Sequence, residues 1–158
     1  MIELQEAQSD KAYQIASSLF KEYATQLGVD LSFQNFHQEL ATIKQQYARP
    51  KGVLYIAYDN LQNPVGCFGI RPFKDSICEL KRMYLKRIYR GQGVGKQLLL
   101  KSIAIGKELG YTKMRLDTLP TMQSAIRLYR SIGFYEIAPY RFNPIEGTKY
   151  FEILLEER

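Results

Sequence analysis

The most constraining feature of the sequence is a group of three glycines, Gly91, Gly93 and Gly95, within residues 89–100. A β-rich run over residues 79–85 precedes them, and an amphipathic pattern typical of a helix follows. Glycine lets the backbone turn tightly with its N–H groups uncovered. At a helix N-terminus, such unpaired N–H groups and the helix dipole both favour an anion. The stretch therefore predicts a strand, a turn and a helix that together bind a phosphate group.

Two common nucleotide-binding motifs do not fit this stretch. A Walker loop would need a glycine where Arg90 stands and a hydroxyl residue where Gln97 stands. A dinucleotide fingerprint would need its last glycine where Lys96 or Leu98 stands, depending on where it starts. The phosphate site therefore belongs to another class, although a plain strand-to-helix turn would also use glycines.

Length and composition indicate an ordinary globular protein. The chain has 158 residues, with 46% hydrophobic and 24% charged side chains, so we expect one domain over residues 1–158. The sequence has no run of about 18 apolar residues and no signal-peptide core at its start. We therefore expect a cytoplasmic protein that does not interact with a membrane.

The charge pattern concentrates near the glycines. The net charge is +6, and the densest group of basic residues is Lys81, Arg82, Lys86, Arg87, Arg90 and Lys96. A coenzyme with several phosphates would explain this group as well as nucleic acid would, and so would a solvated basic face. Because nothing except charge favours nucleic acid, we expect no nucleic-acid partner.

Cysteine and histidine give no sign of a metal site. Cys67 and Cys78 match no zinc or redox spacing, so we expect two small, buried apolar residues. His37 is the only histidine and lies in a polar, helical stretch, so we expect it at the surface. The sequence therefore predicts no metal.

The order of elements predicts an α/β (α+β) protein. We expect strands over residues 2–7, 53–58, 64–72, 77–85, 113–117, 134–137 and 149–155, with a turn over residues 73–76. We expect a first helix from Ser9 or Asp10 to Gly28. A second helix should begin after Ser32 or Asn35, with an apolar stripe of Phe33, Phe36, Leu40 and Ile43. Two more helices are expected, one over residues 93–109 and one from Pro120 to Gly133. The middle strands form an antiparallel meander. The helix over residues 93–109 connects two parallel strands.

Two segments resemble the GNAT N-acetyltransferase superfamily. The pattern Arg90-x-x-Gly93-x-Gly95, after Met83-Tyr84-Leu85, resembles its acetyl-CoA pyrophosphate loop. Residues 125–134, Ala-Ile-Arg-Leu-Tyr-Arg-Ser-Ile-Gly-Phe, are similar to its helix with Leu-Tyr followed by Gly-Phe. A narrower similarity, over residues 117–122 and 143–147, is to small bacterial members. Met122 departs from the pattern, since many members have there an asparagine that binds the pantetheine arm.

The resemblance implies a mixed, mostly antiparallel central sheet flanked by helices, and an acetyl-CoA-dependent N-acetyltransferase. The acetyl group would pass directly to a primary amine in a ternary complex, with acetyl-CoA as co-substrate and no metal. The implied coenzyme-binding residues are Met83, Tyr84, Leu85, Arg90, Gly91, Gln92, Gly93, Val94, Gly95 and Lys96. A non-catalytic acyl-CoA-binding or regulatory module on the same fold is the alternative, because fold does not fix function.

Acetyl transfer needs a proton acceptor for the amine and a proton donor for the leaving thiolate. Tyr129 is the candidate acid, since a phenol carries its proton at neutral pH. The alternative is a core aromatic on an apolar helix face. Glu79 is the candidate base, directly or through water, with Asp117 in reserve. Alternation places Glu79 on one strand face with Lys81, Met83 and Leu85. Burial would raise the pKa of Glu79, although a structural ion pair would also explain this residue.

The acceptor is open at this stage: a small-molecule amine and a peptide or protein amine both fit. We expect residues 140–144 and the early helices to line the acceptor pocket, with Arg141 either recognising an acceptor carboxylate or lying at the surface. Oligomeric state is equally open, and pairing of the closing strands between two chains would give a homodimer.

Overall fold

The computed structural model describes residues 1–28 and 35–155. In chain order its elements are β1 (Glu3–Glu6), α1 (Asp10–Leu27), α2 (Phe36–Ala41), α3 (Ile43–Gln46), β2 (Val53–Tyr58), β3 (Pro64–Lys74), β4 (Ile77–Leu85), the short 3-10 helix η2 (Arg87–Tyr89), α4 (Val94–Glu108), β5 (Lys113–Thr118), α5 (Gln123–Ile132), β6 (Tyr135–Ile137) and β7 (Lys149–Leu154). Every strand expected from the sequence therefore forms.

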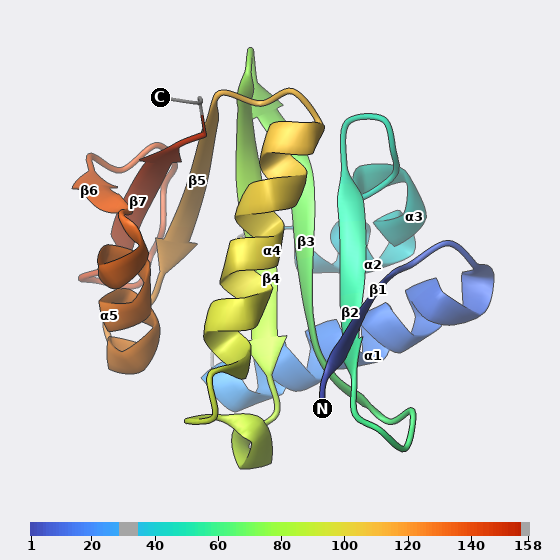
Figure 1. Cartoon of the computed structure of the whole chain (residues 1–158). Coiled ribbons are helices and arrows are strands. Elements are labelled where there is room, and N and C mark those ends of the chain that lie inside the picture. Colours follow the sequence, from blue (N-terminus) through green and yellow to red (C-terminus); the bar gives the residue numbers. More distant parts are fainter. Residues whose placement is uncertain (29–34, 156–158) are drawn as a thin grey trace.

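The strands of the described residues form one sheet in the order β1-β2-β3-β4-β5-β7-β6. Strands β4 and β5 are parallel, while the other neighbouring pairs are antiparallel. A connection between parallel strands must return along the sheet, and α4 does so across one face (Figure 1). This arrangement confirms the predicted mixed, mostly antiparallel sheet and its crossover helix.

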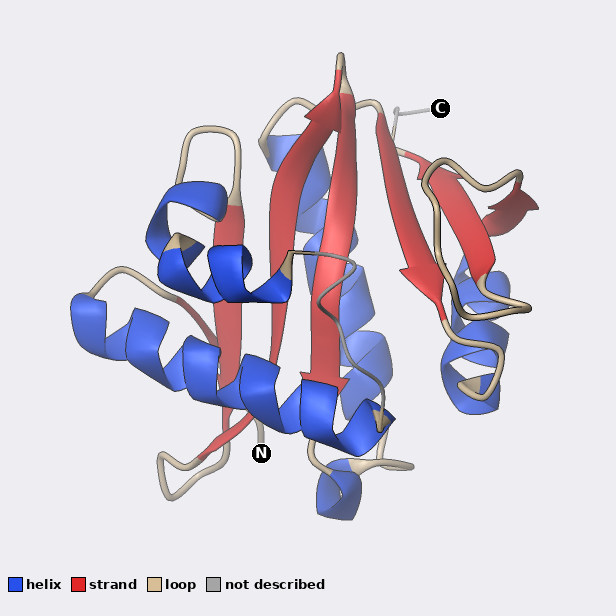
Figure 2. Cartoon of the chain, turned by 180° about the vertical axis from the view of Figure 1, so that it is seen from behind, coloured by secondary structure: helices blue, strands red, loops and turns tan. Residues whose placement is uncertain are grey.

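Two hydrophobic cores lie on opposite faces of the sheet. Helices α4 and α5 lie on one face (Figure 1), and α1, α2 and α3 cover the other (Figure 2). The alternation along β2 shows the division. Val53 and Tyr55 pack in the core under α4, whereas Leu54 and Ile56 pack in the core under α1. The sheet is thus covered on both sides, as the buried β-rich runs of the sequence require.

The first helix has the predicted ends, whereas the second differs from the prediction. The Ser9 hydroxyl accepts a hydrogen bond from the Ala12 N–H, and Gly28 ends α1 at a φ of 68°. Asn35 precedes α2 at a φ of 57° without a side-chain cap, while Ser32 and Phe33 lie outside the described residues. The single expected helix is two short ones. They are separated at Thr42, whose φ is −121° and whose hydroxyl donates to the Gln38 carbonyl.

Two predicted boundaries are wrong. Strand β3 continues through Phe73 and Lys74, because Lys74 still pairs with Ile77, so the turn is confined to residues 75–76. Helix α5 begins at Gln123 rather than at Pro120. Pro120 lies in a preceding turn, and its carbonyl accepts a hydrogen bond from the Gln123 side chain. In both places hydrogen bonding to neighbouring residues outweighs the local propensity that the prediction used.

Strands β4 and β5 separate along their length, which creates the most important irregularity of the sheet. They pair only over three positions, Ile77, Glu79 and the residue between them. Beyond Glu79 the two strands diverge, as Figure 2 shows. Arg82 adopts a φ of 56° at a register shift against β3, which is a β-bulge. Within the described part of the chain, β4 thus has an unpaired edge over its second half.

The bulge corrects the prediction that Glu79, Lys81, Met83 and Leu85 share one face. Met83 and Leu85 belong to the core under α4, together with Leu80. Glu79 and Lys81 alternate with Leu80 and therefore face the other side, toward α3. The extra residue at Arg82 shifts the alternation by one, because a bulge places two residues opposite one.

Three further predictions concern single residues and possible membrane segments. Cys67 and Cys78 are buried and unlinked, as expected. His37 is exposed. Within residues 1–28 and 35–155, no helix combines the length and the apolar character needed to span a membrane.

Candidate active site

The glycine loop leads into the N-terminus of α4 with the geometry of an anion site. Gly91 and Gly93 adopt left-handed φ values of 79° and 82°, which residues with side chains rarely adopt. Gly93 caps α4 without a side chain over the helix end. The N–H groups of the first helical turn have no intrahelical acceptor, and the helix dipole adds partial positive charge. The predicted strand, turn and helix are thus present, and together they can hold a phosphate group.

The Arg90 side chain forms hydrogen bonds that hold the glycine loop in place. Its Nε donates to the Leu85 carbonyl at 2.9 Å, and its Nη2 donates to the Gln26 side chain at 3.0 Å. The side chain therefore ties the loop to the end of β4 and to α1. Lys96, on the first turn of α4, is exposed and adds positive charge nearby.

A narrow slot passes through the sheet where β4 and β5 separate. Its volume is about 20 Å³, which is room for roughly one water molecule. Met83 and Tyr129 line it from the side of α4 and α5, and Lys81 and Asp117 line it from the opposite side. Met122, which departs from the family pattern, also lines the slot and accepts a contact from the Thr118 hydroxyl at 3.6 Å. The slot is therefore lined by side chains from both faces of the sheet.

Tyr129 is both a core aromatic and a lining residue of the slot. Its ring packs at centroid distances of 5.7 Å from Phe134 and 6.2 Å from Phe151. Burial raises the pKa of its hydroxyl above the ordinary value, so the hydroxyl carries its proton at neutral pH. Tyr129 is therefore packed as a core aromatic and also lines the slot, where the role of candidate acid would place it.

Glu79 is the centre of a buried charge cluster. The side chain is only 1% exposed, and Arg141 Nη2 lies 2.8 Å from its Oε2. Arg71 lies 3.3 Å from its Oε1, and the Tyr140 hydroxyl donates to Oε2 at 2.9 Å. Burial alone would raise the pKa of Glu79, but Lys81, Arg141 and Arg71 outweigh it and the pKa is lowered. The expected upward pKa shift is therefore wrong, because the cations nearby matter more than desolvation.

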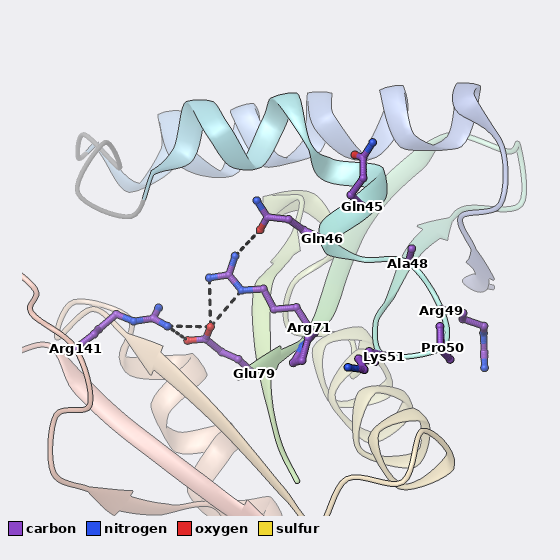
Figure 3. Close-up of a pocket in the computed structure, with 10 residues that line it drawn as sticks. Gln45, Gln46, Ala48, Arg49, Pro50, Lys51, Arg71, Glu79 and Arg141 are labelled. Atoms are coloured by element: carbon purple, nitrogen blue, oxygen red, sulfur yellow. Dashed lines mark hydrogen bonds and ion pairs between the residues drawn. The ribbon is translucent and has the colours of Figure 1, made fainter. Parts of the chain in front are cut away.

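The Glu79 cluster forms one wall of a cavity of about 550 Å³ on the α3 side of the sheet. Figure 3 shows Arg71 and Arg141 reaching the carboxylate from opposite sides, with Gln46 bonded to Arg71. Lys51 lies at the lower rim of the same view. This cavity is large enough for a small organic molecule.

Asp117 and Lys81 connect the cavity to the slot. Asp117 lines the slot, and its Oδ2 lies 3.5 Å from Arg141 Nη1, at the long limit of a hydrogen bond. Burial lowers the pKa of Lys81 to about 8, although the Glu79 charge acts in the opposite direction. Glu79 and Lys81 stand two residues apart on the same strand face. The charged wall of the cavity therefore continues into the slot.

A second buried carboxylate, Glu39, fixes the bulge beside the slot. Arg82 donates to both oxygens of Glu39, at 2.7 Å and 3.1 Å, and Tyr47 donates to Oε2 at 2.7 Å. Phe36 covers the guanidinium at 5.3 Å from its ring centroid. This bidentate pair holds α2 against β4 and keeps Arg82 in its left-handed conformation.

Sequence reasoning missed several members of this site. Arg71 and Tyr140 have no motif around them, and both reach Glu79 only through the fold. Arg141 was a candidate for the pocket, but its contacts with Glu79 and Asp117 were not foreseen. The structure brings together Glu79, Asp117 and Arg141, and places Tyr129 on the other side of the slot. The loop between β6 and β7 contains a single arginine, Arg141, so its composition gives no signal of this pairing.

Comparison with known proteins identifies the family. The model of the acetyltransferase (GNAT) family matches residues 12–134. This chain belongs to the GNAT acetyltransferase family. The GNAT chain is also 39% identical over 136 residues to an uncharacterized N-acetyltransferase of Schizosaccharomyces pombe, covering 85% of this chain and 83% of that protein. It is 30% identical to an uncharacterized N-acetyltransferase of Dictyostelium discoideum, covering 80% and 86%.

Solved structures share the GNAT fold of this chain. A GNAT acetyltransferase from Staphylococcus aureus superposes with a TM-score of 0.81 at 24% identity, covering 99% of this chain and all of the other. A GNAT acetyltransferase from Elizabethkingia anophelis with acetyl-CoA bound has a TM-score of 0.70 at 22% identity, covering 97% of each chain. The fold and the enzyme class suggested by the two motifs are therefore confirmed: this is an N-acetyltransferase whose fold binds acetyl-CoA as co-substrate.

Proposed function

We propose that this GNAT enzyme transfers the acetyl group of acetyl-CoA directly to a primary amine within a ternary complex. The observation that carries the proposal is the slot between β4 and β5, which is lined from both sheet faces. The coenzyme would enter from the side of the glycine loop and α4. The amine would enter from the cavity on the α3 side, so that both reactants meet without leaving the site.

The donor site consists of the loop and the unpaired edge of β4. The first-turn N–H groups of α4, with the backbone of Gly91, Gln92 and Gly93 before them, hold the pyrophosphate. The backbone of Met83, Tyr84 and Leu85 pairs with the pantetheine arm as a neighbouring strand would, and one N–H of this edge polarises the thioester carbonyl. The divergence of β4 and β5 beyond Glu79 supports this assignment, because it leaves that edge open.

Tyr129 protonates the leaving thiolate. Its hydroxyl lines the slot from the side of the coenzyme, and its raised pKa keeps the proton in place until the thiolate forms. As the carbon–sulfur bond breaks, the electron pair goes to sulfur and the Tyr129 proton follows it.

Asp117 accepts the proton of the amine, directly or through water, in preference to Glu79. Both oxygens of Glu79 already bond to cations or to Tyr140, so protonation there would weaken contacts with Arg71 and Arg141. Asp117 lines the slot, and its contact with Arg141 is long, at 3.5 Å. The positive charges of Lys81 and Arg141 also lower the pKa of the bound amine, which favours the nucleophilic form. Glu79 then acts as a positioning residue for Arg141.

Thiol release from acetyl-CoA with a panel of primary amines tests this function. We expect intersecting double-reciprocal plots, which indicate a ternary complex, and a fall in kcat of about 10²-fold for Tyr129→Phe with an unchanged KM for acetyl-CoA. Parallel plots would contradict direct transfer, and an unchanged kcat would remove Tyr129 as the acid. Coenzyme binding without thiol release would favour the non-catalytic module.

A matched pair of glycine variants tests the donor site. Gly93→Val and Gly110→Val both place a side chain at a positive φ, 82° and 94°, with open space around it. The backbone strain is therefore similar, but Gly110 ends α4 far from the loop. Calorimetry should show acetyl-CoA binding lost in Gly93→Val and kept in Gly110→Val. Equal loss of binding in both variants would mean that impaired folding, not loss of the phosphate-binding glycine loop, explains the effect.

We also propose that residues 1–158 act as one N-acetyltransferase domain. The family match spans residues 12–134, and β7, which follows it, pairs with both β5 and β6. The homodimer and the lack of a nucleic-acid partner stay predictions.

A further inference from the structure

The cavity beside Glu79 holds more guanidinium groups than its one carboxylate requires. We propose that Arg71 and Arg141 bind a carboxylate of the acceptor, so that the acceptor is an amine with a carboxylate several bonds from its nitrogen. This inference rests on the proposed acetyl transfer and names the substrate class for the same site. It differs from a general amine pocket because it requires a negative charge on the acceptor.

The two arginines keep donors for a ligand. A guanidinium has five N–H donors in a planar fork that matches a carboxylate. Arg71 uses one N–H toward Gln46 and directs two nitrogens at Glu79. Arg141 directs Nη2 at both oxygens of Glu79 and Nη1 at Asp117. At least two N–H groups remain on each side chain. Both side chains are about one-fifth exposed, at 20% and 23%, and both line the cavity.

The charges around the cavity favour an anion at its inner end. The charged groups that line it are Arg49, Lys51, Arg71, Arg141 and Glu79. Arg49 points away from the cluster in Figure 3 and pairs with Glu6 and Glu108 outside the cavity. At the inner end, Arg71 and Arg141 face Glu79 and Asp117, while Lys51 adds positive charge at the rim. With Arg49 paired elsewhere, three lining cations, Lys51, Arg71 and Arg141, surround one lining carboxylate, Glu79, and one bound carboxylate would reduce this excess.

The spacing between the two parts of the site sets the length of the acceptor. Arg71 contacts Glu79, whereas Lys81 lines the slot. Two residues that stand two positions apart on a strand face are separated by about 7 Å. An α-amino acid carries its amine and carboxylate on one carbon. It could reach Arg141, whose Nη1 lies 3.5 Å from Asp117 at the slot, but it is too short to reach Arg71 as well. A chain of several carbons, as in an ω-amino acid, spans them. The acceptor class is thus a primary amine with a distant carboxylate.

A chain-length series tests the inference. We would measure kcat/KM for β-alanine, 4-aminobutyrate, 5-aminopentanoate and 6-aminohexanoate, and for the alkylamine that matches each one without the carboxylate. We expect a preference of about tenfold or more for the carboxylated amine at the optimal length. Arg141→Gln should remove that preference: KM for the ω-amino acid should rise, and the ratio of its kcat/KM to that of the matching alkylamine should fall to about one. Arg141→Lys should restore part of it, because the charge remains without the fork.

Arg130→Gln is the control. Arg130 pairs with Glu136 and lines neither the cavity nor the slot, so this variant should leave the preference intact. Alkylamine turnover equal to that of every ω-amino acid would overturn the inference while leaving acetyl transfer established. A preference that survives Arg141→Gln would do the same.

Binding provides a readout that does not depend on turnover. Ligand-observed NMR with pentanoate and with pentanol, in the presence of coenzyme A, should show binding of pentanoate alone and loss of that binding in Arg141→Gln. Equal binding of both probes, or unchanged binding by the variant, would overturn the inference even if none of the amines reacts. Failure of the proposed function would instead appear as no thiol release with any amine.

Discussion

Two buried glutamates of this enzyme, Glu39 and Glu79, each bond to arginine and tyrosine side chains, but their surroundings differ. Glu39 bonds to Arg82 and Tyr47, and Glu79 bonds to Arg71, Arg141 and Tyr140. Cations lower the pKa of both carboxyls against the opposing effect of burial. The Glu39 pair is sealed, with side chains 1% and 4% exposed, whereas the arginines around Glu79 are 20% and 23% exposed and open to a cavity.

This difference separates a structural pair from a binding site. In the sealed pair one carboxylate satisfies one guanidinium in a bidentate arrangement, and Tyr47 completes it. At Glu79 one carboxylate is divided between two guanidiniums, and the cavity gives access to the remaining donors. The sealed pair fixes the bulge of β4, and the open cluster can exchange part of its contacts with a ligand. Buried charge alone therefore does not mark function; the access of the partners to solvent does.

The largest effect should come from breaking the sealed pair. Glu39→Gln leaves the Arg82 guanidinium buried without a counter-charge, and we expect a loss of about 3–5 kcal/mol in the free energy of unfolding. Urea denaturation measures it. Glu136→Gln is the control, because Glu136 forms exposed pairs with Arg130 and Lys149 and should cost less than about 1 kcal/mol. A loss as small as in the control would show that the Glu39 pair is not sealed.

The same substitution at the open cluster should cost less. In Glu79→Gln the two arginines can be hydrated through the cavity, so we expect a loss of about 1–2 kcal/mol, discounted from the cost of a buried pair because both are partly exposed. Acetyl-CoA affinity should be unchanged, while KM for a carboxylated acceptor should change as Arg141 loses its support. Equal losses in the free energy of unfolding for Glu79→Gln and Glu39→Gln would contradict the distinction between a sealed Glu39 pair and an open Glu79 cluster.

Much of the fold could be predicted because its signals are local. The apolar period of α4, the glycines before it and the capping residues Ser9 and Gly28 act within a few positions of one another. The bulge could not be predicted, because Arg82 is neither glycine nor asparagine and its conformation depends on an ion pair 43 positions away. For the same reason, the predicted shared face of β4 holds only up to Lys81.

The site could be predicted where the backbone forms it, and less well where side chains do. The glycine loop needs only its own sequence to take shape. Glu79 was recognised as important, but the direction of its pKa shift depends on Arg71 and on Arg141, which is 62 positions away. Desolvation and nearby charge act in opposite directions, so only the packing of distant segments decides which is larger.

The neighbouring cations Lys81 and Arg82 offer a test by pH. Burial lowers the pKa of Lys81 to about 8, from 10.5, whereas Arg82 stays charged beside Glu39. Between pH 8 and pH 10.5 the unfolded chain binds more protons at Lys81 than the folded chain does. Lys81 therefore makes the free energy of unfolding rise with pH in this range. Urea unfolding of wild type and Lys81→Met at pH 7, 8, 9 and about 9.5 should show their difference shifting in favour of the wild type. Parallel curves would contradict it. Glu79, Asp117, Arg82 and Arg71 surround Lys81 and are present in both proteins.

The smallest effect should distinguish the two tyrosines. Tyr47→Phe removes a 2.7 Å hydrogen bond to Glu39 in a site that water does not reach, and Tyr140→Phe removes a 2.9 Å bond to Glu79 beside the cavity. We expect a loss of about 1–2 kcal/mol for Tyr47→Phe, since the carboxylate keeps a lone pair unsatisfied, and of about 0.5–1 kcal/mol for Tyr140→Phe, since water can replace the phenol. Because both rings also pack against aromatic neighbours, phenylalanine preserves those contacts and isolates the hydroxyl. A larger loss at Tyr140 than at Tyr47 would mean that water does not reach Glu79, and the cavity would then lack the access that carboxylate binding requires.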